Sequence, residues 1–568
     1  MKAMRSLRLP LALVCSVALL WGHARLLEGI KVWVYIKEDS LWKYLKVPVL
    51  YDDRGRLRLQ KVRHAFLQKE DFLPESVLKK KLEGYVHAIR GYSRYLGAFS
   101  CYVDPGEIGV IERLPFVEKV DRVRSWVSPE RADLRKVSVV RKLEKGEGDT
   151  FYGESWTQLE MLKIPSLHRR GYTGRGVRIA VFDTGFRKSH VAFSRFIKEE
   201  RLIAERDFVY GDGNVQDEPG EDQGQENHGT AVLSLIGGYI PGVLVGAAYD
   251  AEFLLAKTEY VASETRVEED NYIFAIEWAD SLGADIITSS LAYRDFEDTT
   301  YSFSVLDGKT APLSIAVNKA FSRGIVVVSA AGNFAVGYED GGLYTPADAF
   351  GVITVGAVDS EGRIALFSSH GPTYDGRIKP DVCAMGIGNF VAYGGKDSLF
   401  GYGSGTSFAT PLIAGSCALI LQAHPDWGPA DVLNALRLAG NRALSPDNRY
   451  GWGIPDIADI VLRMPELEME VSAGKVVSVP NPTNGFAKLV FGVKGCWFSP
   501  EGVVFKIFDL RGREVWRKKV DFYPVCGKFE LGWKCVDKRG RSVPSGVYLV
   551  GVYKGKECLA TGKILIFR

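Results

Sequence analysis

The sequence lacks the short signatures of several common sites. It contains no C-x-x-C pair and no H-E-x-x-H, so a zinc site of either pattern is not indicated. No G-x-x-x-x-G-K-[ST] motif is present, so nothing points to a P-loop nucleotide site. Neither sign of charge prevails, because 72 basic residues face 69 acidic ones, and this balance gives no reason to propose nucleic acid as a partner.

Long hydrophobic runs are also scarce, and the one near the start is short. Leu9–Trp21 follows a basic segment and is too short to span a bilayer, which is typical of a signal peptide. We therefore expect residues 1–24 to be a signal peptide that is cut after Ala24, and the protein to be exported. An uncleaved anchor is the alternative, and a lipoprotein attached through Cys15 is a further one.

Cysteine is rare as well. The chain has eight cysteines, and Cys15 would leave with the signal peptide. Four cysteines of an exported chain that lie close together can form two disulfides, or they can be small buried hydrophobic residues. Both possibilities stay open for the four that lie in the last 73 residues, Cys496, Cys526, Cys535 and Cys558.

The 568 residues are too many for one core and divide into segments of different pattern. Residues 25–130 mix predicted strands at Ile30–Ile36 and Tyr95–Val103 with a predicted helix at Pro74–Arg90, so we expect a small α+β domain. Residues 131–150 are charged and poor in aromatic side chains, which indicates an exposed linker.

Residues 151–462 alternate strand-like and helix-like patterns, which predicts an α/β domain with a mostly parallel sheet and helices on both faces. The expected strands are Val177–Phe182, Asp285–Thr288 and Gly324–Ser329, and the expected helices are Gly229–Gly237 and Ser407–Ala423. Residues 470–568 show strands and turn signals without a helix, which predicts an all-β sandwich. Its expected strands are Val476–Val479, Ala487–Val493, Val503–Phe508 and Val547–Tyr553.

Three short segments of the α/β region carry residues suited to nucleophilic catalysis. Asp183 ends a predicted strand in D-T-G, His228 opens a helix in H-G-T-A, and Ser407 opens a helix in G-T-S-F-A-T-P. A serine hydroxyl needs a histidine to accept its proton, and the histidine needs a carboxylate to orient it. Each segment alone has an ordinary structural explanation, as a turn, a helix start or an N-cap.

Taken together, the order Asp, His, Ser and these three contexts resemble the subtilisin-like serine proteases, the subtilase family, over roughly residues 155–460. The resemblance implies a subtilisin-like fold and a catalytic triad of Asp183, His228 and Ser407. It also implies that Asn333 is an oxyanion donor, together with the backbone N–H of Ser407. The substrate-binding residues that it implies are Ser289, Ser290, Leu291, Ala292, Ala330, Ala331 and Gly332. Ala292 stands where the family usually has glycine, which narrows the expected pocket.

An acidic stretch precedes the histidine. Residues 212–226 contain six carboxylates and neither lysine nor arginine. Clustered oxygen ligands suit Ca²⁺, and the family often binds it, but the stretch also fits a solvated acidic loop that attracts basic substrates. Both interpretations stay open and no metal ligand is assigned. The expected chemistry requires no cofactor.

The two flanking segments have resemblances of their own. Residues 25–130 resemble the subtilase propeptide family, which implies an inhibitor that is removed by a cut near residues 131–150. The C-terminal domain resembles sorting domains of the bacterial type nine secretion system and flagellar-hook-cap-type immunoglobulin-like domains. Its matching pieces are Pro480–Pro482, Ile507–Val515, Pro544–Leu549 and Lys563–Arg568. This resemblance implies the outer-membrane secretion machinery as a partner and a secreted or cell-surface protein; a spacer or binding module is the alternative.

The sequence thus predicts a secreted serine endopeptidase that acts on polypeptides and is made as a self-processed zymogen. A catalytically inactive surface adhesin with the same fold is the alternative. An aspartic protease would use Asp183-Thr-Gly185 but needs a second such motif, which the chain lacks. An esterase is disfavoured because Gly405–Ala409 lacks the final glycine of G-x-S-x-G.

Overall fold

The computed structural model describes three stretches of the chain. These are residues 30–122 without 40, 42–44, 63–70 and 75; residues 150–463 without 222, 262–264, 298 and 444; and residues 476–566 without 480–486, 498–502, 521–524 and 555–556. Two compact units divide the chain, one made of Met1–Leu50 and Phe66–Val127 and the other of Tyr51–Ala65 and Ser128–Arg568. The predicted signal peptide and processing segment lie outside the described residues.

The first unit has an antiparallel sheet of four strands in the order β4-β5-β1-β6. The strands are β1 (Ile30–Ile36), β4 (Ala88–Ser93), β5 (Ala98–Val103) and β6 (Val117–Arg122), with helices α4 (Ser76–Glu83) and α5 (Ile108–Ile111) and the short pair β2 (Leu45–Pro48) and β3 (Phe72–Pro74). The mixture of strands and helices is confirmed.

Two predicted bounds in this unit were wrong. The helix predicted for 74–90 ends at Glu83, because Ala88–Ser93 pairs with β5 instead of continuing the helix. The strand predicted for 95–103 begins at Ala98, because the preceding residues form a tight turn. Gly97 closes that turn with φ of 66°, which is easy only for glycine.

The second unit is built on seven parallel strands in the order β15-β14-β13-β12-β7-β11-β8. The strands are β7 (Arg178–Asp183), β8 (Leu202–Asp207), β11 (Glu252–Lys257), β12 (Ile286–Ser289), β13 (Val326–Ala330), β14 (Val352–Val358) and β15 (Val382–Met385). The predicted parallel α/β sheet is therefore confirmed, and the carboxyl ends of these strands share one edge.

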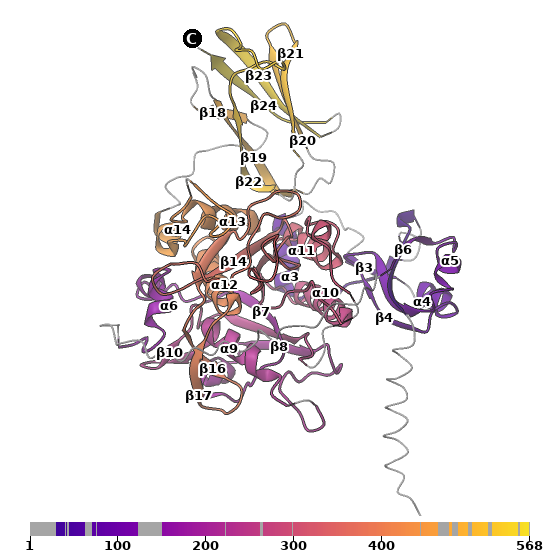
Figure 1. The fold of residues 1–568 in the computed structure, drawn as a ribbon, viewed down its shortest axis with the longest axis vertical. Coiled ribbons are helices and arrows are strands. Elements are labelled where there is room, and N and C mark those ends of the chain that lie inside the picture. Colours follow the sequence, from indigo (N-terminus) through magenta and orange to yellow (C-terminus); the bar gives the residue numbers. More distant parts are fainter. Residues whose placement is uncertain are drawn as a thin grey trace, which may run out of the picture. The chain divides into compact units, whose positions relative to one another are not determined.

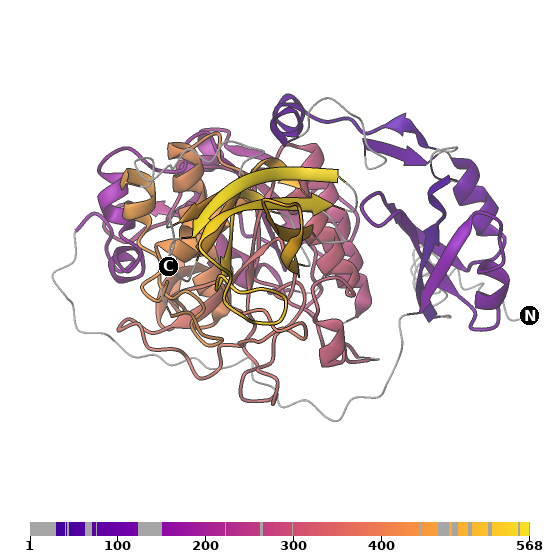
Figure 2. The same cartoon turned by 90° about the horizontal axis from the view of Figure 1, so that it is seen from above.

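Helices cover both faces of this sheet (Figures 1 and 2). α9 (Glu226–Gly237) and α12 (Thr406–Ala423) pack together and share a core with Val181 of β7. Phe182, the next residue, points the other way, with its ring 5.2 Å from that of Tyr272 in α10 (Arg266–Ser281), which packs on α11 (Pro312–Ser322). Burial on both faces explains why β13, β14 and β15 are almost entirely apolar. α12 is apolar and long enough to cross a membrane, but it is mostly buried, as a core helix is.

The C-terminal residues form two antiparallel sheets, β18-β19-β22 and β21-β20-β23-β24. Their strands are β18 (Val476–Val479), β19 (Ala487–Trp497), β20 (Val503–Asp509), β21 (Glu514–Val520), β22 (Val525–Trp533), β23 (Gly546–Lys554) and β24 (Glu557–Ile566). One apolar cluster joins Leu489 and Trp533 of the first sheet to Phe505 and Val552 of the second, so the segment is all-β as predicted. Cys558 is a free thiol, so the four C-terminal cysteines do not form two disulfides.

Candidate active site

Asp183 is the last residue of β7 and is fully buried at the carboxyl edge of the sheet. Its Oδ1 accepts a hydrogen bond from the backbone N–H of Thr184 at 2.8 Å, and its main-chain oxygen accepts one from Thr258 at 3.0 Å. Because β7 lies between β12 and β11, the strand that carries this carboxylate is held by neighbouring strands on both sides. A buried and fixed carboxylate of this kind can orient a histidine.

His228 lies in the first turn of α9, and its Nδ1 is 2.7 Å from Asp183 Oδ1. The glycine after it is required by this approach. A Cβ on Gly229 would lie 2.2 Å from the main-chain oxygen of Gly185 and 2.9 Å from Asp183 Cβ, so any larger residue would push the helix away. The D-T-G and H-G-T segments therefore fit together through two glycines, which local sequence patterns alone do not reveal.

The protonated form of His228 is more favoured beside Asp183 than the protonated form of a free imidazole is in water. Burial by itself lowers the pKa of His228, but the charge and the hydrogen bond of Asp183 outweigh burial and raise the pKa above its usual 6.5. The His228 side chain is 35% exposed, so substrate can reach it. With Nδ1–H donated to Asp183, Nε2 carries the lone pair and can accept a proton.

Ser407 lies in the first turn of α12, directly after Gly405 and Thr406. The helix start is beside the histidine, because the ring of Phe408 is 6.0 Å from that of His228. Ser290 Oγ donates to the main-chain oxygen of Ser407 at 2.9 Å, which ties the helix start to the end of β12. The predicted triad residues are thus gathered at one edge of the sheet.

Asn333 follows β13 and is oriented by the segment before Ser407. Its Oδ1 accepts hydrogen bonds from the N–H of Thr406 at 2.9 Å and from Thr406 Oγ1 at 3.0 Å. Because the oxygen is engaged there, Nδ2 is the donor that remains, and it lies beside Gly405. An amide fixed in this way can donate to an oxyanion formed near Ser407.

The residues predicted to bind substrate lie on two adjacent segments. Ser289 ends β12 opposite Ser329 of β13, so both segments leave the sheet side by side. All of the predicted residues are buried except Ala292, which is half-buried; they are Ser289, Ser290, Leu291, Ala292, Ala330, Ala331 and Gly332.

A pair of stacked aromatic rings lies next to the ends of these two segments, and sequence reasoning missed it. The ring of Tyr344 is stacked on that of Phe334, which follows Asn333, at 4.2 Å between centroids. Tyr293 and Thr345 exchange backbone hydrogen bonds, which places Tyr344 next to the 290–293 segment. Tyr344 is 4% exposed and its hydroxyl donates to Asp295. Burial and this carboxylate raise the pKa of Tyr344 well above its usual range, so the ring stays a neutral phenol.

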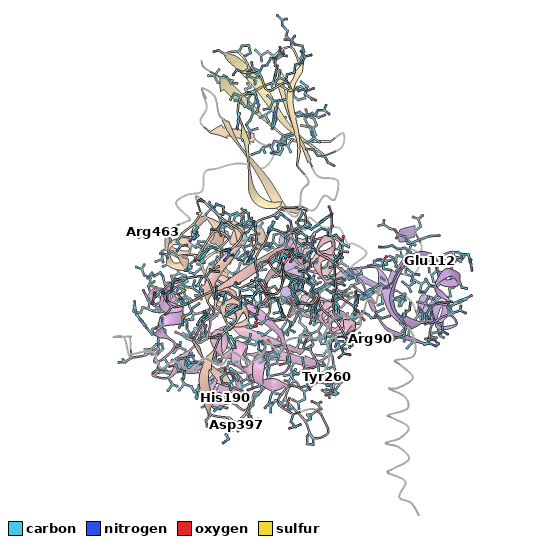
Figure 3. All side chains as sticks on the ribbon, in the orientation of Figure 1. Arg90, Glu112, His190, Tyr260, Asp397 and Arg463 are labelled. Carbon is cyan, nitrogen blue, oxygen red and sulfur yellow. The ribbon has the colours of Figure 1, made fainter. Side chains whose placement is uncertain are left out.

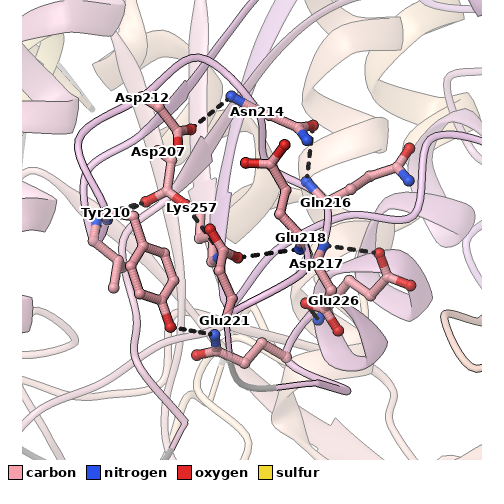
Figure 4. Close-up of polar contacts among 12 residues, drawn as sticks. Asp207, Tyr210, Asp212, Asn214, Gln216, Asp217, Glu218, Glu221, Glu226 and Lys257 are labelled. Atoms are coloured by element: carbon pink, nitrogen blue, oxygen red, sulfur yellow. Dashed lines mark hydrogen bonds and ion pairs between the residues drawn. The ribbon is translucent and has the colours of Figure 1, made fainter. Parts of the chain in front are cut away.

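The acidic stretch before His228 is anchored by a buried lysine (Figure 4). Lys257, the last residue of β11, is fully buried, and its Nζ lies 2.7 Å from Glu221 and 3.1 Å from Asp207. Carboxylate oxygens of Asp212, Glu218 and Glu221 lie within 4.8 Å of one another and are the candidate metal ligands among the described residues. Glu221 is therefore both an ion-pair partner of the lysine and a member of this carboxylate cluster.

A second cation links the histidine helix to the hairpin of β16 (Asn389–Tyr393) and β17 (Leu399–Gly403). Arg187 donates to Glu226 at the start of α9 at 2.6 Å, to the main-chain oxygen of Gly394 at 2.9 Å and to Asp397 at 2.6 Å. Figure 3 shows Asp397 and His190 at the same end of this domain. Arg187 thus ties this hairpin to the start of α9.

Comparison with known proteins agrees with this arrangement. The profile of the subtilase family matches residues 174–453. Subtilisin E of Bacillus subtilis is 33% identical over 328 residues, which are 57% of this chain and 76% of that protein. An alkaline protease of Alkalihalobacillus alcalophilus is 29% identical over 61% of this chain and 80% of its own length. Subtilisin Savinase of Lederbergia lenta is 30% identical over 52% of this chain and 94% of its own length.

Proposed function

Since the chain belongs to the subtilase family, we propose that it is a serine endopeptidase whose catalytic residues are Asp183, His228 and Ser407. The 2.7 Å hydrogen bond between Asp183 and His228, beside the helix start that carries Ser407, is the observation that supports this function best. An inactive adhesin would not need a buried carboxylate, a partly exposed histidine and an oriented amide at one place.

In the proposed mechanism, Ser407 Oγ attacks the carbonyl carbon of a peptide bond while His228 Nε2 takes the hydroxyl proton. The carbonyl oxygen becomes an oxyanion that accepts hydrogen bonds from Asn333 Nδ2 and the Ser407 N–H. The C–N bond then breaks as His228 returns the proton to the leaving amine. Water, activated by His228, attacks the acyl-enzyme and releases the acid. Asp183 stabilises the imidazolium in both halves, and no cofactor takes part.

The substrate residue on the acyl side of the cut bond is, in this proposal, a small one. The Phe334–Tyr344 stack adjoins the ends of the two segments predicted to flank that residue, and the methyl group of Ala292 narrows the space further. The Asp295 carboxylate accepts from Tyr338 at 2.7 Å and from Tyr344, so it is already engaged by two hydroxyls. Alanine, glycine and serine fit this environment better than large or basic side chains.

The proposed activity is tested by covalent labelling with a fluorophosphonate and by casein hydrolysis. Wild-type protein should hydrolyse casein and carry the label on the peptide that contains Ser407, and Ser407→Ala should do neither. Ser416→Ala is the matched control, because Ser416 lies in the same helix, is fully buried and donates to the main-chain oxygen of Leu412. Casein hydrolysis by purified Ser407→Ala would refute the assignment.

We also propose how the chain is exported and activated. Residues 1–24 act as the signal peptide, residues 25–130 as an inhibitor, and the chain cuts itself within 131–150. The C-terminal domain, 470–568, delivers the protein to the cell surface through the outer-membrane secretion machinery. A structural calcium ion in the 212–226 loop would add stability but no chemistry. Self-processing is tested by mass spectrometry of the precursor, which should shorten in wild type and stay whole in Ser407→Ala.

A further inference from the structure

Three turns of the described chain share the pattern D-x-x-G-R and one hydrogen-bond geometry. They are Asp359–Arg363 in the catalytic domain, and Asp509–Arg513 and Asp537–Arg541 in the C-terminal domain. In each turn the aspartate Oδ1 accepts hydrogen bonds from the backbone N–H groups two and four residues later, at 2.9 and 3.0 Å. The closing arginine donates its Nε to the same aspartate, and the glycine has φ of 78°, 76° or 75°. The turn therefore depends on its aspartate, glycine and closing arginine. The same letters at 52–56 lie at the start of helix α3 (Asp53–Val62) instead.

The third residue of the turn differs in charge between the two domains. In the catalytic domain it is Glu361, which pairs with the closing Arg363 at 2.7 Å. In both C-terminal turns, called the arginine turns below, it is an exposed arginine, Arg511 or Arg539. Neither guanidinium makes a hydrogen bond or ion pair with the residues that the structure describes. Because an acidic residue occupies this position in the same turn elsewhere, the fold does not require these two arginines.

The two arginine turns lie side by side in the C-terminal domain. The backbone N–H of Lys538 donates to the main-chain oxygen of Val515 at 2.9 Å, and Lys538 Nζ lies 2.8 Å from Glu514 of β21. Residues 509–519 and 537–541 hold eight basic and three acidic residues, whereas the whole chain has a surplus of only three positive charges. Each of the three acids already pairs with a basic side chain of the same surface. The surplus of positive charge is therefore concentrated at these turns.

The second residue of the turn adds an apolar group to this charged surface. It is Ser360 in the catalytic domain and Lys538 in one arginine turn, but it is Leu510 in the other. Leu510 is 69% exposed and directly precedes Arg511. Because the turn forms equally with serine or lysine at this position, the fold does not require the leucine, and its exposure to water costs free energy that burial elsewhere would recover. Apolar side chains beside cations are typical of surfaces that lie at the boundary between lipid headgroups and hydrocarbon.

We propose that the arginine turns bind the surface of an anionic lipid bilayer, with Arg511 and Arg539 on headgroup phosphates and Leu510 at the hydrocarbon boundary. A guanidinium group suits phosphate, because two of its N–H groups can donate to one phosphate group. An acidic polypeptide would account for the arginines but not for an exposed leucine between them, so lipid is favoured. The proposal goes beyond delivery by secretion machinery, because it gives the C-terminal domain a lipid contact of its own.

The test is co-sedimentation with vesicles of the exported chain, residues 25–568, which carries Ser407→Ala so that it cannot digest itself. Residues 1–24 are omitted, because an apolar signal peptide inserts into lipid by itself. Vesicles of phosphatidylcholine and phosphatidylglycerol in equal parts should bind the protein at least about tenfold more tightly than vesicles of phosphatidylcholine alone. Added salt should weaken the binding, because it screens the attraction between the arginines and the phosphates.

The variants copy residues that the catalytic-domain turn already carries, so the turns should still fold. Arg511→Glu combined with Arg539→Glu should weaken vesicle binding at least about 30-fold, because each basic side chain at an anionic surface contributes a factor of about five. Leu510→Ser should weaken it about tenfold. The matched control is Arg170→Glu combined with Arg449→Glu, which makes the same change of net charge at two exposed arginines of the catalytic domain. Its binding should stay within about threefold of the unsubstituted turns.

Equal weakening by the two charge-reversed variants would overturn the proposal, because general attraction would then explain the binding. Binding that Leu510→Ser leaves unchanged would also overturn it and would indicate an acidic polypeptide as the partner. If the double variant of the turns does not fold, Leu510→Ser and the salt titration decide, and binding that is independent of salt overturns the proposal. The vesicles contain neither secretion machinery nor a peptide substrate, so the result is separate from the proposed delivery and the proposed peptidase activity.

Discussion

Replacement of Lys257 by methionine should destabilise the catalytic domain strongly. The change removes a fully buried ammonium and leaves Asp207 and Glu221, 0% and 9% exposed, without their cation. Loss of one partner from a buried ion pair costs about 3–5 kcal/mol. Unfolding entropy near 2.1 cal/mol/K per residue over the roughly 310 residues of this domain is about 0.65 kcal/mol/K. The melting temperature should therefore fall by about 5–8 °C.

The assay is differential scanning fluorimetry in a Ser407→Ala background, which prevents self-digestion. Lys188→Met is the matched control, because Lys188 pairs with Glu205 at 2.6 Å but both side chains are about one fifth exposed. A pair of that kind contributes about 1 kcal/mol or less, so its melting temperature should fall by at most about 2 °C. Equal shifts in the two variants would refute the argument from burial.

The stabilisation that Lys257 contributes changes with pH in one direction. Burial alone lowers the pKa of Lys257, but the hydrogen bonds and charges of Glu221 and Asp207 raise it overall. The stabilisation is thus fully present below the unfolded lysine pKa of about 10.4 and is lost as the pH rises through the higher folded value. The difference in melting temperature between wild type and Lys257→Met should accordingly be constant from neutral pH to about pH 10.

Other predictions concern catalysis. Asp183→Asn should lower kcat about 10⁴-fold. Because Asp183 raises the pKa of His228, the acid limb of the kcat/KM profile should also move to lower pH in this variant. An acid limb that stays in place would contradict the assignment of Asp183 and His228 as a pair. Gly229→Ala, whose Cβ would lie 2.2 Å from the main-chain oxygen of Gly185, should lower kcat/KM about 10²-fold or more, and normal turnover would show that the close approach is not needed. Tyr344→Gly should raise kcat/KM for phenylalanine relative to alanine at the acyl-side position by about tenfold or more in a peptide series; an unchanged ratio would place the pocket elsewhere. Brief treatment with a chelator should leave kcat/KM within about twofold, and a loss restored by Ca²⁺ would assign the ion a catalytic role.

Local patterns predicted the parts of this protein that depend on neighbouring residues. The alternation in Ile30–Ile36 gave a strand with the bounds that the structure has, and the apolar run of 407–423 gave α12 to within one residue. The three motifs also marked residues that the fold gathers at one edge. Each motif includes the small residues that its own turn or helix start requires.

The missed features depend on contacts between distant segments. Tyr344 reaches the site only because Tyr293 pairs with Thr345, and no spacing rule predicts that bridge. The local sequence does not distinguish Lys257 from the other basic residues, and only the folded sheet places it beside Glu221. The helix predicted for 74–90 was too long because pairing with β5 overrides helical periodicity after Glu83.

The strand ends beside the site also determine which residues of this protein can be changed without disturbing the catalytic residues. Asp207, Lys257 and Asp183 stand in one row across β8, β11 and β7. The loop that leaves this row at Asp207 returns at Glu226, where Arg187 holds it. Both ends are therefore fixed by groups outside the loop, but Val215 and Glu221 between them have to be kept, because Val215 is fully buried and Glu221 pairs with Lys257. For protein engineering, changes of length and charge belong at the exposed residues 211–213 and 219–220, where they leave the catalytic residues and the sheet edge in place.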